Sequence, residues 1–246
     1  MVSPSIVQLS LRIVTLIITV LATSAAQAEF RATLRGTTNY TWRGFTKSAD
    51  KPAVQASIDY EHSSGVYLGS LASTVNFKDR GFDDRSNVEV VPYLGWSFPV
   101  NDDWRADLQV QRYIYDGKVF NNESDYNEIY GFLHFQDTFS ARVSFSPDYY
   151  DREHAAADLA FIGRYTLTET LNVSSGIGYS LTRDVLEYDY LYWNIGMSWY
   201  HRYVALDLRY VQSAFFNEME DVDKDPWRFE PERISATVVF TVTFGF

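Results

Sequence analysis

The chain has 246 residues, no cysteine and a formal net charge of −11, and its isoelectric point is near 4.8. The lack of cysteine excludes disulfide scaffolds, thiolate metal sites and thiol enzymes, and the acidic balance argues against nucleic acid as a partner. Aromatic residues make up 17% of the sequence, yet the mean hydropathy is slightly negative. That combination is unusual for a soluble domain, and the length allows one large all-β domain or two small ones.

The N-terminus has the parts of a secretory signal. Arg12 is the only charged residue before Glu29, and the short apolar run 13–22 follows it. An A-x-A sequence ending at Ala28 completes the pattern of a cleavable signal peptide. A transmembrane anchor is the alternative, but it needs about 20 apolar residues. We therefore expect a signal peptide at residues 1–28, cleavage after Ala28, and a single domain at residues 29–246 that works outside the cytoplasm.

Beyond this signal, polarity alternates with a period of two residues. From Ile234 to Phe246 every second residue is apolar, and the residues between them are nearly all small or polar. Such alternation predicts a strand with one apolar and one polar face. Twelve segments of this kind follow one another, at residues 30–42, 53–62, 66–77, 88–98, 104–115, 126–135, 139–147, 156–165, 171–181, 190–200, 203–211 and 233–246.

The connections between these segments alternate in length. Short ones, such as 63–65 and 136–138, take turns with longer ones, such as 43–52 and 212–232. This pattern predicts a transmembrane antiparallel β-barrel of the outer membrane, with short periplasmic turns and longer extracellular loops. Pro92 lies inside the fourth segment, where it removes a hydrogen-bond donor, so we expect a β-bulge there.

A soluble β-sandwich or lipocalin-like barrel also alternates. It would bury the apolar face, however, and a small soluble barrel cannot hold so many apolar side chains. Aromatic residues also gather where the strands meet the short turns, as in the interfacial girdle of a membrane barrel. They are Tyr60, Tyr67, Phe98, Trp104, Phe135, Phe139, Tyr165, Trp199 and Phe246. Both features favour the membrane barrel.

Several segments resemble a known family. Residues 40–45 (YTWRGF), 52–55 (PAVQ) and 64–69 (SGVYLG) resemble the opening of the TorF-type porin family of proteobacteria, formerly a bacterial family of unknown function. The resemblance extends to the closing strand, and it implies a porin-like barrel in the outer membrane of a Gram-negative bacterium. Phe246 resembles the C-terminal aromatic residue by which the barrel-assembly machinery recognises its clients.

If the apolar side chains face lipid, the polar faces line the lumen. The candidate pore-lining residues carry both signs of charge: Arg31, Arg35, Asp59, Glu61, Glu89, Arg105, Asp107, Arg112, Glu128, Arg142, Asp158, Arg164, Asp207 and Arg209, with Tyr113, Tyr130 and Tyr192 beside them. The lumen is then either a narrow hydrated channel that orients small solutes or a space closed by arginine–carboxylate pairs. Neither sign dominates, so the sequence favours neither cations nor anions.

The densest acidic run, Asn217–Asp225, falls in a predicted long loop. Asp221, Asp223, Asp225 and Glu232 have an EF-hand-like spacing, but Pro226 stands where the sharp turn of that loop requires glycine. We therefore expect a solvated acidic loop and no metal or cofactor. Divalent ions that bridge such loops to lipopolysaccharide phosphates are an open alternative.

Catalytic motifs are weak. The four histidines are scattered, and no Gly-x-Ser-x-Gly nucleophile elbow occurs. We therefore expect no enzyme but a monomeric outer-membrane channel for passive diffusion of small hydrophilic solutes, in contact with outer-membrane lipid and lipopolysaccharide. Two alternatives stay open. One is a structural or adhesive barrel with a closed lumen; the other is a lipid-modifying enzyme, although the predicted outward faces lack the polar cluster it would need.

Overall fold

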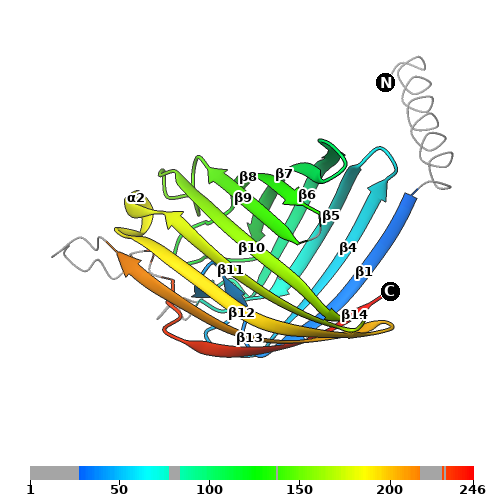
Figure 1. Ribbon diagram of the computed structural model, residues 1–246. Coiled ribbons are helices and arrows are strands. Elements are labelled where there is room, and N and C mark those ends of the chain that lie inside the picture. Colours follow the sequence, from blue (N-terminus) through cyan, green and yellow to red (C-terminus); the bar gives the residue numbers. More distant parts are fainter. Residues whose placement is uncertain (1–27, 78–83, 137, 217–228, 230) are drawn as a thin grey trace, which may run out of the picture.

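The chain forms a closed antiparallel barrel. The computed structural model describes residues 28–77, 84–136, 138–216, 229 and 231–246, so the predicted signal peptide up to residue 27 and the run Asn217–Asp225 lie outside the described residues. In the described part, twelve strands form the wall, and each pairs with its neighbours in the chain until β1 and β14 close the ring (Figure 1). The prediction of a twelve-stranded antiparallel barrel is confirmed.

The strands of the wall are 8 to 13 residues long. In chain order they are β1 (Ala28–Thr37), β4 (Ala53–His62), β5 (Val66–Thr74), β6 (Val88–Pro99), β7 (Trp104–Tyr115), β8 (Tyr126–Phe135), β9 (Phe139–Ser146), β10 (Ala156–Thr168), β11 (Leu171–Leu181), β12 (Asp189–His201), β13 (Val204–Phe216) and β14 (Thr237–Gly245). The connections alternate in length as expected. The longer loops, one of which carries α2 (Arg183–Leu186), lie at one end, which we call the loop end; the short turns and the C-terminus lie at the other, the turn end (Figure 1).

Three predicted strands were too long by at least three residues. The first ends at Thr37 and not at residue 42, the third ends at Thr74 and not at residue 77, and the last begins at Thr237 and not at residue 233. The residues beyond Thr37 leave the wall and form a small hairpin of β2 (Thr41–Trp42) and β3 (Phe45–Thr46). An alternating pattern cannot reveal where a strand leaves a sheet, because a hairpin continues the same period.

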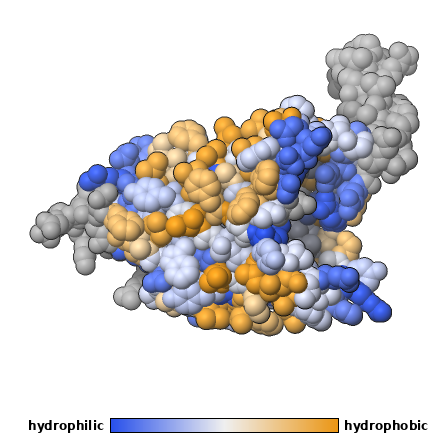
Figure 2. All heavy atoms as spheres, in the orientation of Figure 1, coloured by the Kyte–Doolittle hydropathy of each residue, from blue (hydrophilic) through white to orange (hydrophobic). Residues whose placement is uncertain are grey.

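The outward side chains are apolar. Ile58, Leu108 and Val143 are each more than half exposed, and Figure 2 shows apolar side chains spread over the visible face of the wall. Rings pair near the turn end, with centroids 4.9 Å apart for Trp104 and Phe135. Tyr67 was wrongly placed in this girdle: its hydroxyl donates a hydrogen bond to Asp107 inside the barrel. No helix in the described residues is long and apolar enough to cross a membrane.

Pro92 does not produce the expected bulge. Strand β6 keeps one register against β7 on both sides of Pro92, from Val90 opposite Ile114 to Tyr93 opposite Gln111. Pro92 removes only its own backbone hydrogen-bond donor. The β6–β7 pairing continues past it without an extra residue.

Candidate functional site

The β2–β3 hairpin lies inside the lumen, near the loop end. Its ends continue β1 and β4, and we call residues 38–52 the lumen hairpin. Phe45 packs edge-to-face on Tyr190 of β12, with ring centroids 4.8 Å apart. On its open side, the Thr46 amide donates to the carbonyl of Glu232, at 3.1 Å, and the Ile234 amide donates to the carbonyl of Gly44, at 3.1 Å. The hairpin is therefore held by the segment that leads into β14.

Gly44 allows the hairpin to approach the wall closely. Its φ is +79°, and a Cβ atom there would lie 2.3 Å from Ser213 Oγ and 2.8 Å from Tyr192 Cβ. The Ser213 hydroxyl donates to the Gly44 carbonyl at 2.6 Å. Only glycine meets both conditions without strain, which explains a glycine at the tip of the hairpin.

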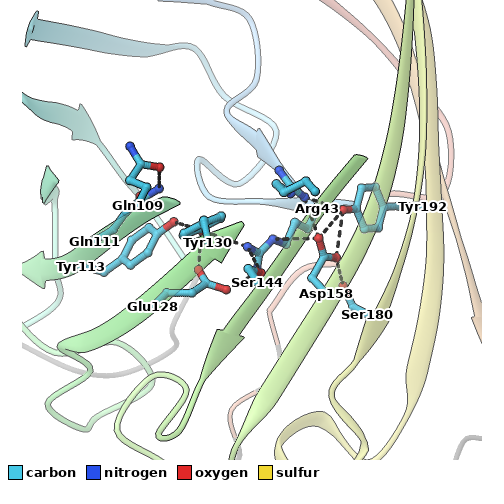
Figure 3. A network of polar contacts seen from close by, with 11 residues as sticks. Arg43, Gln109, Gln111, Tyr113, Glu128, Tyr130, Ser144, Asp158, Ser180 and Tyr192 are labelled. Carbon is cyan, nitrogen blue, oxygen red and sulfur yellow. Dashed lines mark hydrogen bonds and ion pairs between the residues drawn. The ribbon is translucent and has the colours of Figure 1, made fainter. Parts of the chain in front are cut away.

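Arg43, at the same tip, reaches across the lumen to three strands (Figure 3). Its Nη1 donates to Glu128 Oε1 of β8 at 2.8 Å, and its Nη2 donates to Ser144 Oγ of β9 at 2.8 Å and to Tyr130 Oη at 3.0 Å. Its Nε lies 3.6 Å from Asp158 Oδ1 of β10. The side chains of Arg43 and Glu128 are 5% and 1% exposed, so this is a buried ion pair.

Asp158 joins a second arginine to this network. Arg142 Nη2 donates to Asp158 Oδ1 at 2.7 Å, Ser180 Oγ donates to its Oδ2 at 2.7 Å, and the Tyr192 hydroxyl lies 2.9 Å from Oδ2. Two arginines thus face two carboxylates, and their charges cancel. Such charge balance is what buried ions require. The buried Nε atoms of Arg43 and Arg142 have no hydrogen-bond partner among the described residues.

Lys47 makes the other ionic contact of the hairpin. Its Nζ donates to Glu89 of β6, and the hydroxyls of Tyr40 and Tyr115 donate to the same carboxylate at 2.8 and 2.7 Å. The ammonium also lies 4.8 Å from the ring centroid of Tyr113, a cation–π contact. Burial lowers the pKa of Lys47, which lies in the loop between two spanning strands, and the charge of Glu89 opposes that shift.

Aromatic rings cover the hairpin on the side of the loop end. Tyr150 stands at their centre, with ring centroids 4.5 Å from Phe229 and 4.7 Å from Tyr126. Phe77 and Tyr115 join the same buried cluster. This half of the lumen is therefore packed like a protein core.

The other half of the lumen is hollow. Below the hairpin, a cavity of about 510 Å³ extends along β12, β13, β14, β1 and β4 toward the turn end. Its lining is largely polar and includes Arg35, Gln55, Asp207 and Arg209, with Trp42 of the hairpin as part of its roof.

The structure divides the predicted pore-lining residues into groups. Glu89, Glu128, Arg142 and Asp158 form the buried network with the hairpin. Arg35, Asp207 and Arg209 line the cavity. Arg31, Asp59, Glu61, Arg105, Asp107 and Arg164 occupy the inward positions of their strands nearer the turn end, where Arg31 pairs with Glu61.

Arg112 does not line the lumen, contrary to expectation. It alternates with Tyr113, which is buried inside the barrel, so its own side chain lies on the outer face. There it is half exposed and pairs with Asp125 at 3.3 Å, near the loop end. The sequence assigned both residues to the same face, which strand geometry forbids.

Sequence reasoning missed Arg43 and Lys47, the two hairpin cations that pair with carboxylates of the wall. Both fall in the first long connection, where a charged residue is expected to be solvated. One signal was present: the segment 40–45, on which the family resemblance rests, contains Arg43 and Gly44.

A family model described as "bacterial protein of unknown function (Gcw_chp)" matches residues 21–242. The chain belongs to this family. The match does not confirm the narrower TorF-type name. A search of curated proteins found no match.

Solved structures share the fold of this Gcw_chp protein. The KdgM porin aligns with a TM-score of 0.54 and 10% identity over 88% of this chain and 99% of its own. The NanC porin aligns with a TM-score of 0.54 and 10% identity over 87% of this chain and 98% of its own. A KdgM porin in complex with disordered oligogalacturonate aligns with a TM-score of 0.53 and 9% identity over 89% of this chain and 99% of its own. The fold is therefore that of outer-membrane porins, and these neighbours are porins and not enzymes.

Proposed function

We propose that the protein is an outer-membrane channel for small hydrophilic solutes, closed by the lumen hairpin in the conformation described above. The observation that carries this proposal is that the segment blocking the lumen is a loop and not part of the wall. The lumen is blocked by a loop segment, residues 38–52, while the twelve wall strands enclose a polar cavity on the side of the turn end. The hairpin can therefore leave the lumen without breaking the wall.

The chemistry of the contacts supports a gate over a permanent plug. Arg43 and Lys47 hold the hairpin through buried ion pairs with Glu128 and Glu89. Burying such pairs carries a desolvation cost of several kcal/mol per ion, and apolar packing would give a more stable plug. On release, the same charges regain their hydration in a water-filled lumen. The desolvation cost of these pairs therefore narrows the free-energy difference between the closed and open states.

The barrel's two ends agree with this function. The apolar outer face would contact outer-membrane lipid, with the loop end outward beside lipopolysaccharide and the turn end in the periplasm. The backbone of Phe246 pairs with Ala32, at 2.9 and 3.1 Å, and the exposed Phe246 ring stands at the turn end. That position suits recognition of the C-terminal strand by the barrel-assembly machinery. We place the chain there as a monomer.

A permanently closed structural barrel is the second candidate, favoured by the complete pairing of Asp158. Conductance of the protein purified from outer membranes and inserted in planar bilayers separates the two. A gated channel is expected to be closed most of the time, with discrete openings of constant conductance. Silence at every voltage from a heat-modifiable, hence folded, barrel would favour the structural barrel and contradict the channel.

A further inference from the structure

The cavity below the hairpin has one arginine, Arg35, that no described residue neutralises. We propose that this cavity binds a small hydroxylated carboxylate, such as a sugar acid, with Arg35 holding the carboxylate. This inference rests on the proposed function and names the class of ligand that the cavity of the closed channel takes.

The cavity contains two arginines, and one of them is fully engaged. Arg209 pairs with Asp207 at 3.0 Å and donates to Asn194 Oδ1 at 2.6 Å and to Ser174 Oγ at 2.8 Å. Its charge is balanced by Asp207, and its N–H groups point into these bonds. Arg209 therefore stabilises the wall and has few N–H groups left to bind a ligand.

Arg35 differs from Arg209 in both respects. It forms no ion pair among the described residues, and its side chain is exposed to the cavity. Its one side-chain hydrogen bond within the described part of the chain is long, 3.4 Å from Nη1 to Gln55 Oε1. A guanidinium has five N–H donors in a planar fork, so most of those on Arg35 are available to a carboxylate.

The side-chain oxygen of Gln55 faces Arg35. The amide of Gln55 is buried and donates to Ser73 Oγ at 3.1 Å, which turns its oxygen toward Arg35.

The net charge of the cavity selects for an anion. Asp207 cancels one of the two arginines, so a single positive charge remains in a protein whose formal charge is −11. A monovalent anion balances this charge. Cations would meet only a carboxylate that is already paired with Arg209 and hydrogen-bonded by Ser198 at 2.6 Å.

The other lining groups suit hydroxyls and an apolar ring face. Thr241 and Thr243 of β14 border the cavity beside Arg35, and the Trp42 ring borders it from above. Threonine hydroxyls both donate and accept hydrogen bonds, and an aromatic ring covers the C–H face of a sugar. The volume of about 510 Å³ lies within the range of sites for single small molecules.

Titration calorimetry of the detergent-solubilised protein with D-glucuronate, D-glucose and inorganic phosphate tests this inference. Glucuronate is expected to bind, and glucose and phosphate to bind at least about tenfold more weakly, because each lacks one of the two features recognised. Arg35→Met is expected to weaken glucuronate binding by at least about tenfold. Gln55→Glu keeps the arginine but gives it an internal carboxylate, and should weaken binding similarly.

Arg31→Met is the matched control. Arg31 lies four positions earlier on the same inward face of β1 but outside the cavity, paired with Glu61 and with Glu29. Its loss is expected to leave binding unchanged. Equal binding of glucose, equal binding of phosphate, or equal losses in the Arg31 and Arg35 variants would each overturn the inference.

Calorimetry needs no current, so this test is separate from that of the proposed function. A channel that conducts but does not bind glucuronate overturns only the inference about the solute. A protein that binds glucuronate but never conducts overturns only the channel.

Discussion

Replacement of residues 39–50 by a short glycine–serine linker is expected to raise the conductance at least about tenfold over that of the parent protein. The linker removes Arg43, Lys47 and Phe45 from the lumen but leaves every wall strand intact. The aromatic cluster around Tyr150 then no longer packs against the hairpin, and water enters the lumen from the loop end. Single-channel recording in planar bilayers gives the conductance of both proteins.

The same variant should select cations. Without the hairpin, Glu89, Glu128 and Asp158 face the open lumen, and of the network's arginines only Arg142 remains. A constriction with surplus carboxylates attracts cations. The reversal potential in a KCl gradient is therefore expected to shift toward the potassium potential. A chloride-selective pore, or an unchanged conductance in a folded variant, would contradict the role given to the hairpin.

Arg43→Ala is expected to destabilise the docked hairpin by about 3–5 kcal/mol, because Glu128 is left buried without its counter-charge. Hydrogen exchange at Thr46 and Ile234 measures this. The Thr46 amide donates to the carbonyl of Glu232 and the Ile234 amide to the carbonyl of Gly44, each at 3.1 Å, across the contact between the hairpin and the segment that leads into β14. Both bonds need the docked hairpin, so exchange at both amides should accelerate in the variant.

Two further variants show whether the buried charge is responsible. Arg112→Ala removes an arginine from an exposed pair with Asp125 and is expected to cost about 0–1 kcal/mol. Arg43→Met combined with Glu128→Gln removes both charges and should recover most of the protection lost in Arg43→Ala. If the double variant exchanges as fast as the single one, the ion pair is not what holds the hairpin.

Much of the wall could be predicted from the sequence because each strand carries its own period. Ile234 to Phe246 reads as an alternating strand without knowledge of its partners, and the lengths of the connections order the strands. Arg112 and Tyr67 were misplaced because the same period of two is sensitive to register. An error of one position along a strand assigns a side chain to the opposite face of the wall.

The site could be predicted only in part. Glu89, Glu128, Arg142 and Asp158 were expected inside because they lie on polar faces, but the cations that pair with Glu89 and Glu128 come from a loop 42 or more residues away. No local pattern shows that Arg43 enters the barrel, since loop residues obey no period. The closed half of the lumen and the free Arg35 thus required the structure.

The central claim, that the lumen hairpin closes the barrel, is tested most directly by locking it. Phe45 and Arg233 face each other across an antiparallel bridge, a spacing that a disulfide can span. Because the chain has no cysteine, Phe45→Cys with Arg233→Cys can form only this bond within one molecule. Single-channel conductance is then recorded before and after reduction. We predict a silent oxidised form and a conducting reduced form; an oxidised form that conducts like the reduced one would contradict the account.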